Sequence, residues 1–193
     1  LFTMVMMFAV GQLSSRVQPK YLIAAGAIII AISMYGLIGL TPDLNFWFFA
    51  KSRMLLGLGL PLIFLPIMAA SYDGLPPGKT DQASALMNAA RNTGGSIGVS
   101  LASNVLAHRE QFHQSVLTGD AIPSGIAYQD TLHQVTQYFV AQGSSLAQAQ
   151  QQAIAWIGKQ IQAQAALLAY VDVFWVLMLI SFAAVPLALL LRK

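Results

Sequence analysis

Arg91 is the residue in this sequence whose position says most about chemistry. It lies within residues 83–107, a stretch that contains no other Asp, Glu, Lys or Arg and is long enough to cross a lipid bilayer. A lone guanidinium at membrane depth costs roughly 2.5–3.5 kcal/mol on insertion scales, so such a residue usually faces a bundle interior or a water-filled cavity. The placement of Arg91 therefore indicates a protein that moves something through a membrane, and not a soluble enzyme.

The neighbours of Arg91 extend this polar site. Helical spacing places Asn88 and Asn92 on the same broad polar face as Arg91. We predict that these residues, together with Met87, line a transport pathway in which Arg91 contacts substrate or biases a distant proton-carrying carboxylate by its charge. Two alternatives stay open for Arg91, a structural ion pair and hydrogen bonds to backbone carbonyls.

Small residues follow on the same segment. Gly94 and Gly98 are four residues apart and share a helix face, with Gly95 beside them. Small side chains let the backbone of a neighbouring helix approach closely in a membrane. We therefore expect Gly94, Gly95 and Gly98 to serve helix packing.

The composition points to a membrane protein. The chain has 193 residues, of which 56% are hydrophobic and only 9% charged, whereas soluble domains carry about 25% charged residues. It has no cysteine, which excludes disulfides and thiolate metal sites. The scattered basic residues argue against nucleic-acid binding, and no metalloprotease or phosphate-loop motif is present. We expect no catalytic residue, no metal and no cofactor.

Five apolar segments predict an all-α membrane protein. The first is too short to cross a bilayer and is interpreted as the end of a truncated helix, while the other four are long enough to span. These segments are residues 1–13, 21–40, 46–70, 83–107 and 165–191. The predicted domains are transmembrane helices in residues 1–107, a polar insert in residues 108–164, and the last transmembrane helix with a cytoplasmic tail in residues 165–193.

The polar insert is predicted to be helical. Apolar residues recur at three-to-four spacing from Tyr128 to Phe139 and again from Leu146 to Leu168, with Ser144 or Ser145 as a candidate helix cap. We picture two short amphipathic helices near the membrane surface, the second leading into the last span.

Basic residues set the expected orientation. One set of alternate loops holds Arg16, Lys20, Lys79, Arg192 and Lys193. The positive-inside rule places these loops in the cytoplasm. The insert then lies outside, in the periplasm of a Gram-negative cell, and the C-terminus lies in the cytoplasm.

Residues 46–70 carry further candidate features. Lys51 and Arg53 lie near the start of this span, where they either snorkel to the interface or, for Arg53, line the external mouth of a pathway. Pro61 and Pro66 are expected to kink or loosen the helix. Asp172 is the one acidic residue close to a span, and no carboxylate lies at mid-membrane, so a proton-carrying acid is expected outside this chain.

Two motifs resemble a known family. The loop from Gly11 through Arg16 to Lys20 resembles the weaker second copy of the major facilitator superfamily signature loop, with Ser14-Ser15 where that signature usually has an aspartate. The string from Ala83 to Gly98, and the glutamine-rich stretch 150–161, resemble the fourteen-helix drug:proton antiporters of that superfamily, the EmrB/QacA group and its EmrB type in particular. The resemblance covers essentially the whole chain.

The resemblance implies a fold and a function. The chain would be a C-terminal fragment, most of the second helix bundle, and would need the missing N-terminal half of the same transporter. It would export hydrophobic or amphipathic drugs from the bacterial inner membrane by proton antiport with alternating access, with a periplasmic adaptor and an outer-membrane channel as further partners. Two alternatives remain: a membrane scaffold or partner subunit without transport, and a transporter of a siderophore, lipid or metabolite.

Overall fold

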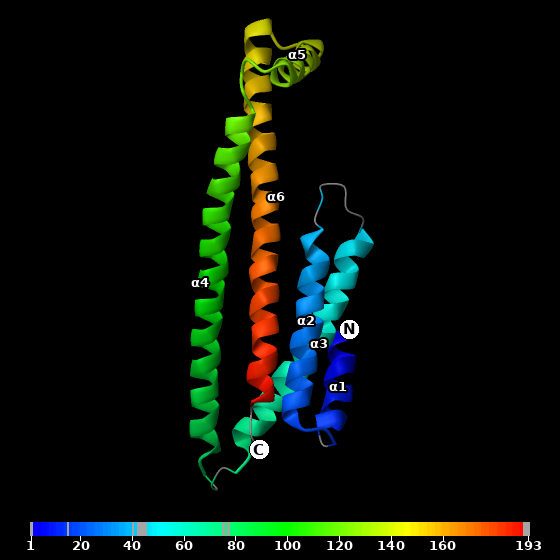
Figure 1. The fold of residues 1–193 in the computed structure, drawn as a ribbon, viewed down its shortest axis with the longest axis vertical. Helices are drawn as coiled ribbons and strands as arrows, with labels where there is room; N and C mark the ends of the chain where they lie inside the picture. Colours follow the sequence, from blue (N-terminus) through cyan, green and yellow to red (C-terminus); the bar gives the residue numbers. More distant parts are fainter. Residues whose placement is uncertain are drawn as a thin grey trace. The chain divides into compact units, whose positions relative to one another are not determined.

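The computed structural model describes residues 2–14, 16–39, 41, 46–74, 76 and 78–190, and within these ranges all regular structure is α-helical (Figure 1). The predicted all-α class is therefore confirmed. Arg192, Lys193 and Ser15, on which parts of the orientation and loop predictions depend, lie outside the described residues. The helices are α1 (Phe2–Ser14), α2 (Pro19–Ile38), α3 (Phe46–Tyr72), α4 (Thr80–Asp120), α5 (Ile126–Ala141) and α6 (Leu146–Leu189).

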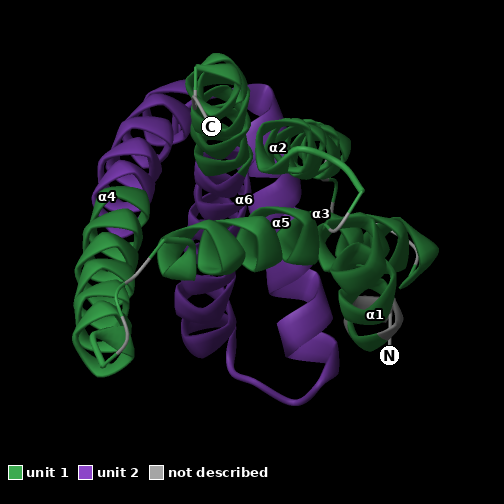
Figure 2. Ribbon diagram, turned by 90° about the horizontal axis from the view of Figure 1, so that it is seen from below, with its two compact units in different colours: residues 1–102, 171–193 green, residues 103–170 purple. Residues whose placement is uncertain are grey.

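The chain divides into two compact units, coloured separately in Figure 2. Unit 1 comprises residues 1–102 and 171–193, and unit 2 comprises residues 103–170. α4 and α6 each contribute one part to each unit. The predicted domain boundaries, at 107/108 and 164/165, stay a prediction.

Three helices of the described chain, α2, α3 and α6, are long and apolar enough to cross a membrane. α4 covers the predicted span 83–107 as unbroken helix, but it is not among these three. Its polar run around Arg91, with Asn88 and Asn92, lowers its hydropathy. That α4 crosses the membrane stays a prediction, and it requires this polar run to be kept away from lipid.

Two helices continue beyond the predicted boundaries of their spans. The helix through Arg91 continues past residue 107 to Asp120. The second insert helix is not a separate short helix, because α6 runs without a break from Leu146 through the predicted last span to Leu189. The physical reason is that neither junction contains a helix-breaking residue: residues 107–118 and 162–185 hold no glycine or proline. α3 likewise runs unbroken through Pro61 and Pro66, both of which are buried.

In unit 1, α2 and α3 pack through two matched pairs of small residues. Gly26 of α2 lies against Gly59 of α3, and Ser33 lies against Ser52. A Cβ atom built on Gly26 would lie 2.8 Å from the carbonyl oxygen of Gly59. Within each helix the two positions are seven residues apart, so both pairs lie on one face. Because the earlier of the two α2 residues faces the later of the two α3 residues, the two helices are antiparallel.

The two serines are buried, and their hydroxyl groups find hydrogen-bond partners within the pair. The Ser33 Oγ lies 2.8 Å from the Ser52 carbonyl oxygen, the Ser52 Oγ lies 3.1 Å from the Ser33 carbonyl oxygen, and the two hydroxyl oxygens are 2.9 Å apart. Each hydroxyl has one proton, so at any moment two of these three hydrogen bonds can form. Sequence reasoning missed this pair and the Gly26–Gly59 contact.

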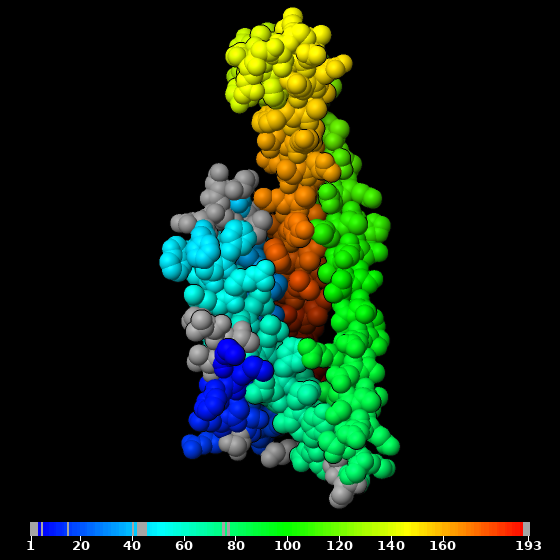
Figure 3. All heavy atoms as spheres, turned by 180° about the vertical axis from the view of Figure 1, so that it is seen from behind, coloured from blue at the N-terminus to red at the C-terminus, as the bar shows by residue number. Residues whose placement is uncertain are grey.

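Apolar side chains surround these small residues in unit 1. One buried cluster joins Ala31, Met34 and Leu37 of α2 to Met178 of α6. A second joins α1, α2 and α3 through Val10, Leu22 and Leu62. The first cluster holds α2 against α6, and the second holds α1, α2 and α3 together. Figure 3 shows α1 and the lower part of α3 side by side.

Unit 2 has a core of small residues. The α6 positions Ala149, Ala153, Ala165 and Ala169 are fully buried. Ala149 and Ala153 are four residues apart, as are Ala165 and Ala169, so each pair lies on one helix face. The step of twelve residues from Ala153 to Ala165 turns the helix by about 120°, so the two pairs face different directions. The first turn of α6 is capped as predicted, because the Ser145 Oγ accepts a hydrogen bond from the Gln148 N–H at 3.5 Å. Gly143, with a positive φ of 96°, ends the preceding turn.

Candidate functional site

Arg91 lies on an open groove formed by α4 and one aromatic ring of α3. The groove is lined by Arg91, Asn92, Gly94, Gly95 and Ser96 with Phe64. The guanidinium carbon of Arg91 lies 5.4 Å from the centre of the Phe64 ring, within cation–π distance. The structure therefore brings the predicted cation together with two predicted packing glycines, and it adds Phe64, which sequence reasoning missed.

The α4 face around Arg91 is exposed. Every residue from Asn88 to Leu101 is exposed in the described chain, and no residue of α4 is buried. A Cβ atom built on Gly94, Gly95 or Gly98 would have no neighbour within 4 Å. The predicted packing role of these glycines has no partner among the described residues and stays a prediction. Asn88 is exposed outside the groove, and Met87 is half-buried.

A second contact fixes the start of α4 to the end of α3. The Tyr72 hydroxyl and the Ser84 Oγ are 2.8 Å apart and share a hydrogen bond. Two glycines in the connecting turn, Gly74 and Gly78, have φ angles of 76° and 88°, a region that favours glycine. This turn sets which face of α4 is directed toward the end of α3. It therefore helps to place Arg91 near Phe64.

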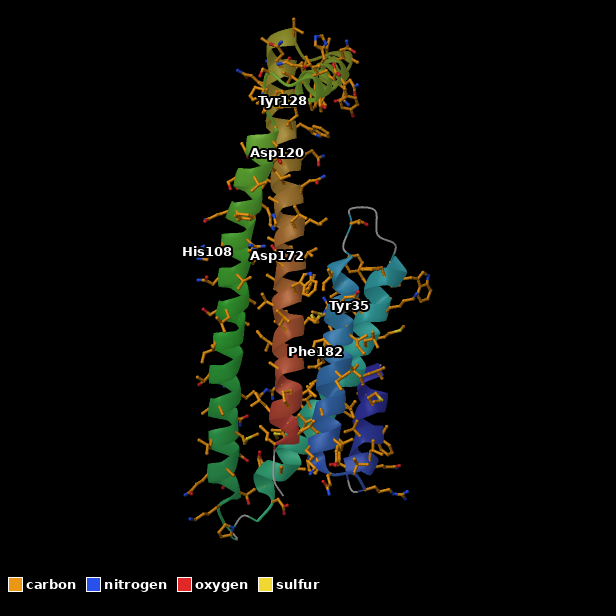
Figure 4. All side chains as sticks on the ribbon, in the orientation of Figure 1. Tyr35, His108, Asp120, Tyr128, Asp172 and Phe182 are labelled. Atoms are coloured by element: carbon orange, nitrogen blue, oxygen red, sulfur yellow. The ribbon has the colours of Figure 1, made fainter. Side chains whose placement is uncertain are left out.

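Arg53 does not join the groove. It is exposed on α3, eleven positions before Phe64 in sequence, which corresponds to about 16 Å along a helix. Its assignment to the pathway stays a prediction, as does the alternative that Arg53 and Lys51 snorkel to the interface. Asp172, the acid nearest to a span, lies partly buried on α6 (Figure 4).

The predicted loop motif forms a separate pocket at one end of α2. Arg16 and Lys20 line it, together with Ser71 and Asp73 at the end of α3. Gly11 is not part of the lining, and a Cβ atom built on it would meet nothing within 4 Å. The two basic residues of the motif therefore share a charged pocket, whereas its glycine makes no close contact in the described chain.

Comparison with known proteins identifies the family. The model of the Major Facilitator Superfamily matches residues 1–112, more than half of the chain. The chain therefore belongs to the major facilitator superfamily, and it is a multi-pass membrane protein, as the resemblance of its motifs predicts.

Individual relatives narrow the likeness. The chain is 27% identical to the multidrug export protein EmrB of Escherichia coli strain K12 over 167 residues, covering 86% of this chain and 31% of that protein. It is 26% identical to the protein of the same name from Haemophilus influenzae, covering 91% and 33%. It is 24% identical to the fatty acid resistance protein FarB of Neisseria gonorrhoeae, covering 70% and 26%.

The chain spans about a third of the length of these two EmrB relatives. No solved structure matches it. The likeness to multidrug export proteins agrees with the group that the sequence motifs predict.

Proposed function

We propose that the chain is the C-terminal part of a multidrug efflux transporter that exports hydrophobic or amphipathic compounds. The observation that carries the proposal is the groove on α4, where a lone guanidinium, an exposed aromatic ring and small residues share one open surface. The likeness to multidrug export proteins supports it. Such a surface offers a charge for polar groups, a π-face for rings and space for varied shapes.

The proposal includes coupling and location. Export is driven by proton antiport with alternating access, and it needs no cofactor. The transporter lies in the bacterial inner membrane with the insert in the periplasm and the C-terminus in the cytoplasm. The N-terminal half supplies the proton-carrying carboxylate, and a periplasmic adaptor with an outer-membrane channel completes the path. In the described chain α2 and α3 contain no Asp or Glu and α6 contains only Asp172, which is consistent with that division of labour.

The test uses the full-length transporter in a drug-sensitive bacterial strain. Arg91→Ala should lower resistance and dye efflux to the level of cells without the transporter, while the amount of protein in the membrane stays the same. Arg91→Lys should give intermediate export, because it keeps the charge but loses the planar group that lies over Phe64. Lys79→Ala, an exposed loop cation outside the groove, is the matched control.

Two outcomes would count against the proposal, and two further measurements address the substrate and the coupling. If the Arg91→Ala variant exported as well as wild type, Arg91 would have only a structural role. The main support for the proposal would then be lost. A wild-type protein that inserts normally but changes the accumulation of no compound would favour the scaffold. Fatty acids belong in the test panel because one relative is named for resistance to them. Proton coupling is measured separately, as substrate-induced collapse of a pH gradient in everted vesicles.

A further inference from the structure

The charged pocket lies at the N-terminal end of α2, a helix about as long as the hydrocarbon core of a bilayer is thick. α2 has 20 residues, which rise about 30 Å, the thickness of a bilayer's hydrocarbon core. The pocket is lined by residues before and at the start of α2, including Arg16 and Lys20, and by residues at the end of the antiparallel helix α3. Both helices are apolar enough to span, so these two ends meet at one face of the membrane.

The pocket combines positive charge with an apolar wall. Arg16 and Lys20 supply two cations, and Asp73 supplies one carboxylate, so the charged side chains leave an excess of one positive charge. In the part of the chain that the structure describes, no ion pair joins either cation to Asp73. Ile23 and Ile67 line the same pocket. Lys20 also lies 5.3 Å from the centre of the Tyr21 ring, an aromatic residue suited to the interface.

We propose that this pocket binds the headgroup of an anionic phospholipid of the phosphatidylglycerol type. The phosphodiester pairs with Arg16 and Lys20, the glycerol hydroxyls donate hydrogen bonds to Asp73, and an acyl chain follows Ile23 and Ile67. The excess of one positive charge matches a lipid with one negative charge better than a zwitterionic lipid. Basic pockets between transmembrane helices bind anionic headgroups by the same chemistry.

The lipid would join the loop after α1 to the end of α3, and both segments surround the start of α2. The inference goes beyond drug export and requires only that α2 and α3 span the membrane. Lipid binding is measured without any drug, so its failure and the failure of the export proposal are distinguishable.

The test is native mass spectrometry of the full-length transporter, titrated with phosphatidylglycerol. Each basic side chain near a membrane surface contributes about fivefold in affinity, so Arg16→Gln with Lys20→Gln should weaken binding about 30-fold. The matched control is Lys51→Gln with Lys79→Gln, which removes the same charge from exposed residues outside the pocket and should bind as wild type does. Ala70→Trp, which fills the pocket without changing charge, should also lose the lipid.

Several results would overturn the inference. Equal weakening in the control pair would mean that bulk charge, and not the pocket, attracts the lipid. Equal affinity for phosphatidylcholine would remove the charge argument. Binding of glycerol phosphate as tightly as the intact lipid would make the pocket a site for a free phosphate ester. If the double glutamine variant does not fold, retention of the lipid by Ala70→Trp would be equally decisive against the proposal.

Discussion

Gly26 offers the sharpest test of how this fold is held together. A Cβ atom added there would lie 2.8 Å from the Gly59 carbonyl oxygen and 2.9 Å from the Leu62 Cβ, whereas ordinary contacts begin at 3.4 Å. The Gly59 oxygen belongs to the backbone, so it cannot rotate away. Gly26→Ala therefore requires α2 and α3 to move apart by about half an ångström at this crossing, an overpacking that costs about 1–3 kcal/mol.

Gly36 provides the matched control on the same helix. A Cβ atom there meets nothing within 4 Å. Alanine in place of a helical glycine stabilises by about 0.5–1 kcal/mol through backbone entropy, and both substitutions share this gain. The difference between Gly26→Ala and Gly36→Ala therefore isolates the packing cost.

The assay is the apparent melting temperature of the full-length transporter in detergent, followed by the loss of its monodisperse gel-filtration peak after heating. Gly26→Ala should melt below wild type and Gly36→Ala at or slightly above it. Gly59→Ala should fall between them, because its closest contact, at 2.7 Å, is the movable Ile30 side chain. If Gly26→Ala melted at or above Gly36→Ala, the close crossing of α2 and α3 would be refuted.

Three further predictions concern other parts of the chain. Ser33→Ala and Ser52→Ala should show a coupling free energy of about 0.6 kcal/mol, and at most about 1.7 kcal/mol, in a double-mutant cycle of unfolding in detergent; additive effects would contradict the mutual hydrogen bonds. Cysteine in place of Val140, which is 41% exposed, should react with an impermeant thiol reagent outside spheroplasts, whereas labelling only after lysis would reverse the proposed orientation. Gly94→Leu should lower the yield of folded full-length protein if another helix covers this face, while normal yield would mean that Gly94 faces lipid.

The positions of the membrane helices were largely predictable from hydropathy alone. The predicted segments 21–40 and 46–70 correspond within two residues to α2 and α3, because long apolar runs bounded by polar turns leave little choice. Helix ends in the polar insert were less predictable. Residues 107–118 contain neither glycine nor proline to stop α4. Hydropathy indicates where an apolar span ends, but it does not indicate where the helix ends.

The contacts between helices were not predictable. Gly26, Gly59, Ser33 and Ser52 stand in apolar runs where many small residues occur, and the seven-residue spacing on each helix becomes meaningful only once the helices are paired. Nothing in the sequence singled out Phe64 as a site residue, because an aromatic residue in an apolar span usually serves helix packing. Arg91 was predictable from its charge and its place in an apolar segment, since the cost of a guanidinium in a membrane depends on its surroundings.

The glycines of this chain divide into two classes, and the division bears on how a transporter of this family is built. Gly26 and Gly59 already have packing partners within the chain, because each lies against the backbone of the other's helix. Gly94, Gly95 and Gly98 of α4 have open surroundings instead, and they adjoin Arg91 and Asn92 on an exposed face. An unpaired guanidinium beside lipid is costly. The α4 face is therefore the surface that a further helix or an aqueous pathway must cover, whereas the facing small residues of α2 and α3 are already covered within unit 1.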